Sequence, residues 1–123
     1  METISVHASR DYEVRIGSGL LTRTGELSAP LIKGRHAIIV SDSNVWPLYG
    51  SMVQASLEDA GFQVDHFVFP AGEQSKNTDT LFQLLTCLAQ KGMTRSDGVF
   101  ALGGGVTGDM AGLAASLYLR GIP

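Results

Sequence analysis

The 123-residue sequence lacks the features on which several classes of protein depend. Its one cysteine, Cys87, excludes a disulfide framework and favours a reducing compartment. It has no basic run, and a formal net charge of −3 argues against nucleic acid as a partner. No apolar run approaches the length of a membrane span, and the N-terminus lacks the basic and apolar regions of a signal peptide. We therefore expect a cytoplasmic protein without membrane contact.

Motifs for several kinds of catalysis are also missing. No G-x-S-x-G, Walker A or C-x-x-C motif occurs. The three histidines, His7, His36 and His66, are scattered, and none pairs with another at the spacing of metal ligands. Cys87 lies inside a helical pattern, which is more typical of a core thiol than of a nucleophile. No residue of this chain is therefore assigned as catalytic or as a metal ligand.

Short apolar runs alternate with helical patterns along the sequence. Strands are predicted at residues 4–8, 12–16, 37–40, 62–69 and 99–102, and helices at 20–27, 45–57, 81–88 and 106–119. The first two strands flank Ser9-Arg10-Asp11, which predicts a hairpin. Alternating strands and helices imply right-handed crossovers in an α/β fold, with a Rossmann-like, mostly parallel sheet and helices on both faces.

The last predicted helix, 106–119, has a single charged residue, Asp109. Its other residues are apolar or small and leave no polar face, so we expect the helix to be buried on all sides. Because a domain of this size cannot cover such a helix alone, missing sequence or another subunit is expected to cover it. Gly121-Ile122-Pro123 also resembles the start of another strand. We therefore interpret residues 1–123 as a truncated N-terminal domain.

The most informative stretch is the glycine turn, Gly103 to Gly105. A strand-like run, Val99–Leu102, stops at these glycines, and an apolar helix pattern follows. Glycines let the backbone approach a phosphate, and the free N–H groups and dipole of a helix start favour negative charge. The stretch also fits G-x-G-x-x-G, which is a weak signal outside a strand–turn–helix context. The alternative is a tight turn that packs the helix against the sheet and binds nothing.

Three of the predicted parallel strands end in polar turns, at 41–44, 71–76 and 103–109. These turns share the carboxyl edge of the sheet, where α/β proteins bind ligands, so we expect their side chains to converge. Diphosphate suits the glycine turn. The carboxylates and amides of the other two turns suit ribose hydroxyls or an adenine edge. Together they predict a dinucleotide site.

Each polar residue also has a simpler interpretation. Asp42, Ser43 or Asn44 would only cap the following helix. Glu73 and Lys76 would form an exposed ion pair of little energetic value. Asp109, expected in the first helical turn, is favoured by the dipole but would repel a diphosphate, so it should face ribose hydroxyls or an amide donor, or act only as a dipole partner. Arg120 either interacts with the helix dipole or presents its guanidinium to an anionic substrate.

Four sequence runs closely resemble 3-dehydroquinate synthases. They are residues 69–76 (FPAGEQSK), 94–97 (TRSD), 101–109 (ALGGGVTGD) and 118–121 (YLRG). The resemblance extends from about Ser41 onward, in the family's order and spacing, and its G-E-x-x-K and G-G-G-x-x-G-D motifs are specific. It implies the N-terminal domain of a two-domain lyase that converts 3-deoxy-D-arabino-heptulosonate 7-phosphate to 3-dehydroquinate and phosphate in the shikimate route to chorismate and aromatic amino acids. NAD oxidises and then reduces the substrate.

The resemblance also implies a divalent metal, zinc or cobalt, held by a C-terminal domain that this sequence lacks, and we expect a homodimer. The implied cofactor-binding residues are Asp42, Asn44, Ala71, Gly72, Glu73, Gln74, Ser75, Lys76, Gly103, Gly104, Gly105, Val106, Thr107, Gly108 and Asp109. Within this set, Asp42 and Asn44 would contact the adenosine half of NAD. Glu73 and Lys76 would do the same through ribose hydroxyls.

The glycine turn has the other implied role: Gly104, Gly105 and Asp109 would hold the diphosphate and its neighbouring ribose, and Arg120 matches a family position near the substrate. Three other functions stay open. A related sugar-phosphate cyclase, making an inosose or a valiolone, shares the same N-terminal motifs. An iron- or zinc-dependent polyol or alcohol dehydrogenase shares the glycine turn, although the G-E-Q-S-K run argues against it. A stand-alone nucleotide-binding module follows if the 123 residues are complete.

Overall fold

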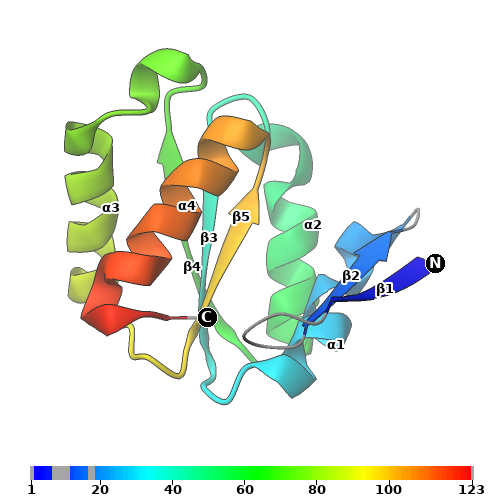
Figure 1. Ribbon diagram of the computed structural model, residues 1–123. Coiled ribbons are helices and arrows are strands. Elements are labelled where there is room, and N and C mark those ends of the chain that lie inside the picture. The colour runs from blue at the N-terminus through cyan, green and yellow to red at the C-terminus, as the bar shows by residue number, and fades with distance from the viewer. Residues whose placement is uncertain (1, 7–11, 17–18, 123) are drawn as a thin grey trace.

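The computed structural model describes residues 2–6, 12–16 and 19–122 (Figure 1). Its strands are β1 (Glu2–Val6), β2 (Tyr12–Ile16), β3 (His36–Asp42), β4 (Gln63–Phe69) and β5 (Gly98–Leu102). Its α-helices are α1 (Thr24–Ser28), α2 (Trp46–Asp59), α3 (Thr78–Gln90) and α4 (Gly105–Leu117). Short 3₁₀ helices span Leu20–Arg23, Ala29–Leu31, Glu73–Ser75 and Tyr118–Arg120. None of the described helices is long and apolar enough to cross a membrane.

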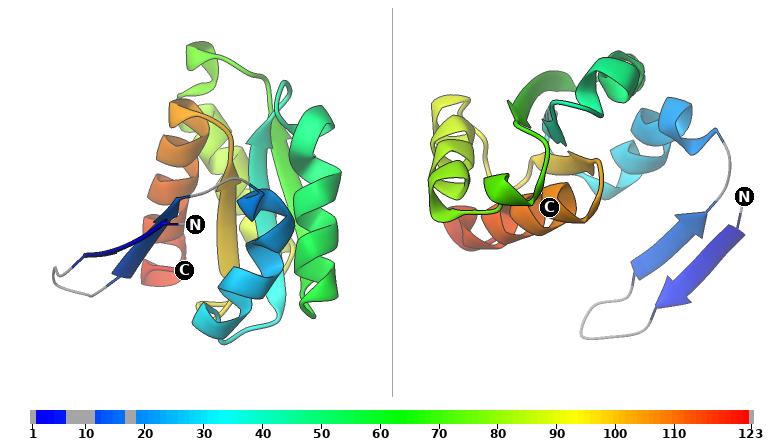
Figure 2. Two further views of the ribbon diagram at one scale, coloured as in Figure 1. Left: turned by 90° about the vertical axis from the view of Figure 1, so that its right-hand side faces the viewer. Right: turned by 90° about the horizontal axis from the view of Figure 1, so that it is seen from above.

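The main sheet is parallel, with strand order β4-β3-β5. Seen from above in Figure 2, α3 and α4 lie on one side of these strands and α1 and α2 on the other. The predicted α/β fold with helices on both faces is therefore confirmed. β1 and β2 form a separate antiparallel pair beside the sheet (Figure 2). The turn predicted between them, at residues 9–11, lies outside the described residues.

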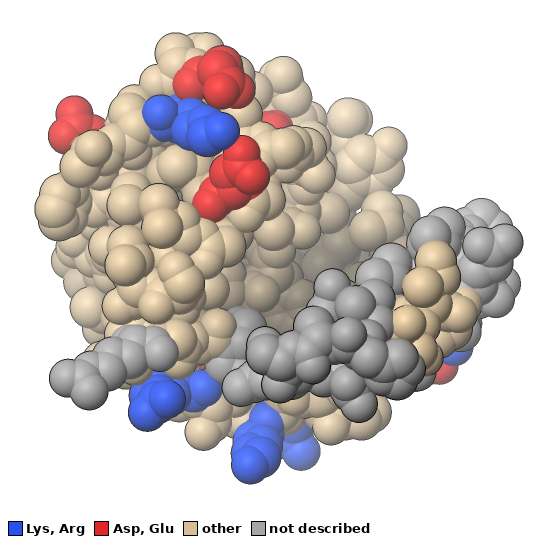
Figure 3. All heavy atoms as spheres, viewed as in Figure 1, with Lys and Arg blue, Asp and Glu red and all other residues tan. Residues whose placement is uncertain are grey.

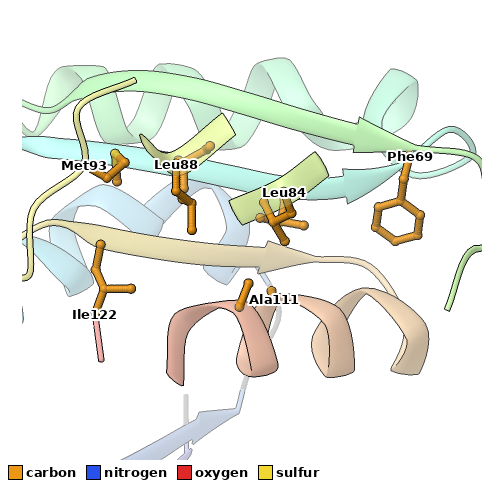
Figure 4. Packing of buried hydrophobic residues seen from close by; sticks show 9 residues of the cluster. Phe69, Leu84, Leu88, Met93, Ala111 and Ile122 are labelled. Atoms are coloured by element: carbon orange, nitrogen blue, oxygen red, sulfur yellow. The ribbon is translucent and has the colours of Figure 1, made fainter. Parts of the chain in front are cut away.

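The central strand β3 carries the core on both of its faces. Ile38 and Val40 pack toward α3 and α4, in the cluster shown in Figure 4, whereas Ala37 and Ile39 pack toward α2. All four are fully buried. Full burial of a large aliphatic side chain stabilises a fold by about 1.5–3 kcal/mol, so this strand anchors both helical layers.

The predicted strand at 37–40 continues by two polar residues. Ser41 and Asp42 extend β3 because they still pair with Val68 and Phe69 of β4. The apolar pattern ends earlier because the strand has reached the edge of the core, where polar side chains are needed. β3 therefore delivers its last two residues directly to the carboxyl edge of the sheet.

Helix α4 is covered on one face by the described residues, and its bounds differ from the prediction. Its buried residues, such as Met110 and Ala114, face the sheet, whereas Leu113 and Leu117 are 48% and 54% exposed. Within the described residues, α4 is thus buried on one face only, because nothing packs on its outer side. The helix ends at Leu117, because Tyr118 is extended with ψ 118° and Leu119 then adopts a left-handed conformation with φ 49°. The expected cover over this apolar helix stays a prediction.

Candidate functional site

The loops that follow β3, β4 and β5 lie at one end of the sheet, at the top of Figure 1, as predicted. Hydrogen bonds join the first loop to both others. The Ser41 hydroxyl donates to the Leu102 carbonyl at 2.7 Å, immediately before the glycine turn. The Ser43 N–H donates to the Phe69 carbonyl at 2.9 Å, and the Ser43 hydroxyl accepts the Ala71 N–H at 2.9 Å.

An ion pair joins the second loop to α4. Lys76 Nζ lies 2.9 Å from Asp109 Oδ2 and 4.0 Å from Glu73 Oε1. The hydrogen bond to Asp109, its negative charge, and to a smaller extent that of Glu73 raise the pKa of Lys76 above its ordinary value. The predicted pair of Lys76 with Glu73 is therefore the longer of two contacts. Together with the serine contacts, this ion pair connects all three loops to one another.

Asp109 lies in the second turn of α4, not in the first turn as predicted. The helix begins at Gly105, one residue before the predicted start, and Asp109 is its fifth residue. A carboxylate there gains little from the helix dipole, which acts within the first turn. Its partner is the Lys76 ammonium, which compensates a charge that would otherwise repel a diphosphate. Charged groups of both signs lie side by side over this edge in Figure 3, and the face below them over α4 carries none.

Asp42 closes the turn just before α2 and does not cap the helix itself, whose N-cap is Val45 and has no side-chain hydrogen bond. Its Oδ1 accepts the N–H groups of Asn44 at 2.9 Å and Val45 at 2.8 Å, just before α2 begins. Both of these hydrogen bonds use Oδ1, and they fix the direction of Oδ2. Asn44 is exposed beside it. These turn contacts are compatible with a ligand contact at Asp42, which stays a prediction.

The loop after β4 is held together largely by its own side chains. The Gln74 amide donates to the Ala71 carbonyl at 2.8 Å, and the buried Ser75 hydroxyl donates to the Pro70 carbonyl. Asn77 caps α3, because its Oδ1 accepts the Thr80 N–H at 2.9 Å. Gln74 and Ser75 thus have structural partners within the loop. Glu73, by contrast, has a side chain that is 77% exposed.

The glycine turn contains two kinds of glycine. Gly103 has φ +156°, and a Cβ added there would lie 2.7 Å from Thr107 Oγ1, so its packing requires glycine. A Cβ added to Gly104 or Gly105 would meet nothing within 4 Å. Gly104, the N-cap of α4, makes no side-chain cap, so the first N–H groups of the helix are left for another partner. Open space and free donors favour an anion cradle over a merely structural turn.

Three further residues of the predicted set behave differently from a simple ligand contact. Val106 packs against the core, so only its backbone can face a ligand. Thr107 is 1% exposed, and its hydroxyl has no hydrogen-bond partner among the described residues. Arg120 lies in the 3₁₀ turn after α4, about 20 Å from the glycine turn at 1.5 Å per helical residue. The structure therefore does not bring Arg120 to the carboxyl edge.

The described histidines and Cys87 have structural environments. His36 Nε2 pairs with Asp65 Oδ2 at the opposite edge of the sheet, and the His66 ring stacks on Trp46 with centroids 4.5 Å apart. Cys87 packs against the core, and burial raises the pKa of its thiol. Among residues 2–6, 12–16 and 19–122, no group of three acidic, histidine or cysteine side chains is placed to hold a metal ion.

Comparison with known proteins finds similarity to 3-dehydroquinate synthases in two ways. The family model described as 3-dehydroquinate synthase N-terminal matches residues 66–123. A 3-dehydroquinate synthase from Streptococcus suis (strain 05ZYH33) is 50% identical over 111 residues, which cover 90% of this chain and 31% of that protein. The resemblance predicted from the motifs is confirmed. It also extends into the first forty residues, where the sequence motifs gave no signal. The chain spans about a third of the length of the curated relatives it matches.

Two solved structures share the fold. A 2-deoxy-scyllo-inosose synthase, complexed with carbaglucose-6-phosphate, NAD+ and Co2+, superposes with a TM-score of 0.87 at 26% identity, covering 98% of this chain and 33% of that one. ValA, a 2-epi-5-epi-valiolone synthase from Streptomyces hygroscopicus subsp. jinggangensis 5008 with NAD+ and Zn2+ bound, superposes with a TM-score of 0.77 at 32% identity, with coverage of 98% and 33%. This chain therefore shares its fold with about a third of each of these cyclases.

Proposed function

We propose that residues 1–123 form the N-terminal, NAD-binding part of a 3-dehydroquinate synthase. The complete enzyme is then an NAD- and metal-dependent lyase that converts 3-deoxy-D-arabino-heptulosonate 7-phosphate to 3-dehydroquinate and phosphate, a small-molecule reaction of the shikimate pathway. The observation that carries this proposal is the open space at Gly104 and Gly105, in a chain 50% identical to a streptococcal 3-dehydroquinate synthase.

The carboxyl edge fits a dinucleotide. The uncapped N–H groups at the start of α4 would donate to the diphosphate, and the space at Gly104 and Gly105 admits it. Asp42, held by two backbone N–H groups, and the exposed Glu73 would accept hydrogen bonds from ribose hydroxyls. When bound, NAD supplies a hydride acceptor, and the return of the hydride leaves the overall reaction redox-neutral.

Lys76 would keep the site electrostatically favourable for an anion. Its ammonium lies 2.9 Å from the Asp109 carboxylate and close enough to Glu73 to be influenced by it. Without this cation, two carboxylates would face the diphosphate. The role we assign to Lys76 is therefore charge compensation as well as a direct cofactor contact.

The divalent metal of the proposed enzyme is assigned to residues outside this chain. The described residues present no suitable group of three ligands. We therefore derive no metal-assisted step from this chain, and the substrate pocket that would include Arg120 is assigned to the assembled enzyme.

Sequence identity favours 3-dehydroquinate synthase over the other sugar-phosphate cyclases. The chain is 50% identical to the streptococcal enzyme, against 26% and 32% for the inosose and valiolone synthases. The three share a fold, so superposition alone does not separate them. A polyol dehydrogenase and a stand-alone module are less well supported, because the G-E-Q-S-K run and the relative length of the chain both favour a cyclase domain.

The exposed surfaces of the chain support a larger enzyme. The apolar outer side of α4, with Leu113 and Leu117 half exposed, is available for a further domain or for a partner in a homodimer. β5 is an edge strand of the described sheet. Since α4 lies on the same face as α3, a right-handed crossover after α4 would place a following strand beside the free edge of β5.

Two measurements test this proposal. Titration of the isotopically labelled chain with NAD at millimolar concentration should shift the amide resonances of Gly103 to Gly105, and Glu73→Gln should weaken the response. The absence of any shift in the wild-type chain at saturating cofactor would contradict the NAD assignment. Phosphate release from substrate with NAD and zinc should stay at the metal-free background, because the described residues present no group of three ligands that would fix the ion. Turnover above that background would instead support a complete enzyme.

A further inference from the structure

Ser41 is a fully buried polar residue at the end of an apolar strand. Its hydroxyl donates to the Leu102 carbonyl at 2.7 Å. Buried hydroxyl groups are normally satisfied in this way, but the choice of acceptor is informative. Leu102 is the last residue of β5, and its carbonyl belongs to the peptide unit that enters the glycine turn.

This hydrogen bond fixes the direction of that peptide unit. In a planar trans peptide the C=O and the following N–H point in opposite directions. Because Ser41 holds the Leu102 carbonyl toward β3, the Gly103 N–H is directed away from β3. On its other side, Gly103 packs against Thr107, whose Oγ1 would lie 2.7 Å from an added Cβ. The start of the turn is therefore fixed by contacts on both sides.

Ser43 does the same for the loop after β4. Its N–H donates to the Phe69 carbonyl, and its hydroxyl accepts the Ala71 N–H, both at 2.9 Å. These two contacts hold the chain before and after Pro70. Ser43 is exposed, unlike Ser41, so its side chain is not needed to fill the core.

We propose that Ser41 and Ser43 are positioning residues of the carboxyl edge. Ser41 sets the glycine turn and Ser43 sets the loop at 70–77, so that groups from three separate strand ends face one ligand. Neither hydroxyl contacts the ligand itself. The inference rests on the proposed function for the identity of that ligand, NAD, whereas the contacts that carry it belong to the chain alone.

The experiment compares Ser41→Ala and Ser43→Ala with the matched control Ser56→Ala. Ser56 also joins two segments of the chain, because its hydroxyl donates to the Thr22 carbonyl at 3.0 Å and accepts the Gly25 N–H at 2.9 Å. These contacts link α2 to α1 and to the 3₁₀ helix before α1, away from the site. Each variant is measured by thermal unfolding and by titration with NAD, followed through amide resonances. Ser41→Thr, which keeps the hydroxyl, is the rescue variant.

All three alanine variants should lose some thermal stability. Ser41→Ala and Ser43→Ala should also bind NAD roughly three- to tenfold more weakly, the change expected from one lost hydrogen bond. Ser56→Ala should keep the wild-type affinity, and Ser41→Thr should recover it. Wild-type affinity in both site variants would overturn the inference. If Ser41→Ala does not fold, the exposed Ser43 decides the outcome through its own variant.

A failure of the proposed function gives a different pattern. If the wild-type chain shows no response to NAD, the cofactor assignment fails and the amide resonances of the unliganded chain decide the inference. Shifts extending across residues 103–105 in Ser41→Ala, and across 70–77 in Ser43→Ala, with none in Ser56→Ala, support positioning. Shifts confined to the substituted residue and its hydrogen-bond partner overturn it.

Discussion

The two ends of the parallel sheet use glycine in opposite ways. At the amino edge, a Cβ added to Gly34 would lie 2.2 Å from Asp97 Oδ1 and 2.8 Å from the Ser96 carbonyl oxygen. At the carboxyl edge, a Cβ added to Gly104 or Gly105 would meet nothing within 4 Å. Gly34 is therefore required by the packing of the chain. The open space at Gly104 and Gly105 is what a ligand approaching from outside would need, as we propose.

The polar groups of the two edges differ in the same way. At the amino edge, the buried Asp97 accepts the Thr94 N–H at 2.8 Å, the Thr94 hydroxyl at 3.0 Å and the His36 N–H at 3.3 Å. At the carboxyl edge, Lys76 and Asp109 form an exposed pair, with 45% and 60% of their side chains accessible. The amino edge uses its polar groups to hold the chain together. The carboxyl edge leaves them accessible, which is typical of a ligand site.

Asp97→Ala, at the amino edge, gives the largest expected loss of stability. The variant removes a buried acceptor and leaves the donors of Thr94 and His36 without a partner, so the free energy of unfolding should fall by about 3 kcal/mol. Denaturant titration measures this change. The control is Asp109→Ala, at the exposed edge, which should change stability little. Equal losses in both variants would remove the distinction between a structural edge and a ligand edge.

Gly34→Ala comes next and concerns packing alone. The added methyl group meets the Ser96 backbone as well as the Asp97 carboxylate, so the chain must shift, at a cost of about 2 kcal/mol. Gly104→Ala is the matched control, since its methyl group enters open space and should change stability by less than about 0.5 kcal/mol. Thermal unfolding of the two variants under identical conditions measures the contrast. A destabilised Gly104→Ala chain would mean that the turn requires glycine for its own geometry.

Gly104→Val and Gly105→Val test the ligand at the same positions. A larger side chain there would block the approach of the diphosphate to the backbone. Affinity for NAD should fall by on the order of tenfold, or about 1.4 kcal/mol, while the fold persists. Calorimetric or NMR titration measures the affinity, and circular dichroism checks the fold. Unchanged NAD binding in both variants would leave the glycine turn with a structural role only.

Most of the fold could be predicted from the sequence because it depends on local pattern. The buried strands β3 and β5 follow from continuous apolar runs, and α2 and α3 follow from helical spacing. What covers the outer face of α4 could not be predicted, because an apolar sequence specifies burial without specifying what provides it. Its end at Leu117 was also missed, since the left-handed Leu119 has no signature in its residue type.

The candidate site was predictable in its location but not in its contacts. The common edge of parallel strands follows from topology, which is why three distant polar turns could be grouped. The contact between Lys76 and Asp109 spans 33 residues of sequence, so no spacing rule could find it. The same is true of Ser41 and Leu102, 61 residues apart. The position of Arg120 follows from the length of α4, because a 13-residue helix carries the chain from the carboxyl edge to the opposite end of the sheet.

Thr107→Val gives the smallest expected effect. It tests whether a buried polar group at the carboxyl edge belongs with the structural groups or with the ligand-binding ones. Thr107 lies at the carboxyl edge but is 1% exposed, and its hydroxyl has no partner among the described residues. Valine has nearly the same shape and removes the cost of burying an unpaired hydroxyl, so the unliganded chain should be more stable by up to about 1 kcal/mol. Thermal unfolding without ligand measures this gain.

An NAD titration of the same Thr107→Val variant tells whether the Thr107 hydroxyl has a structural role or takes part in ligand binding. If the hydroxyl remains unpaired when the cofactor is bound, NAD affinity should match that of the wild-type chain, since the hydroxyl is buried beside Gly103. Weaker binding would mean that the hydroxyl finds its partner in the complex, and its burial without a hydrogen bond would then be a feature of the empty site. Loss of stability in the unliganded variant would contradict both outcomes, because it would require a hydrogen bond that the described structure does not contain.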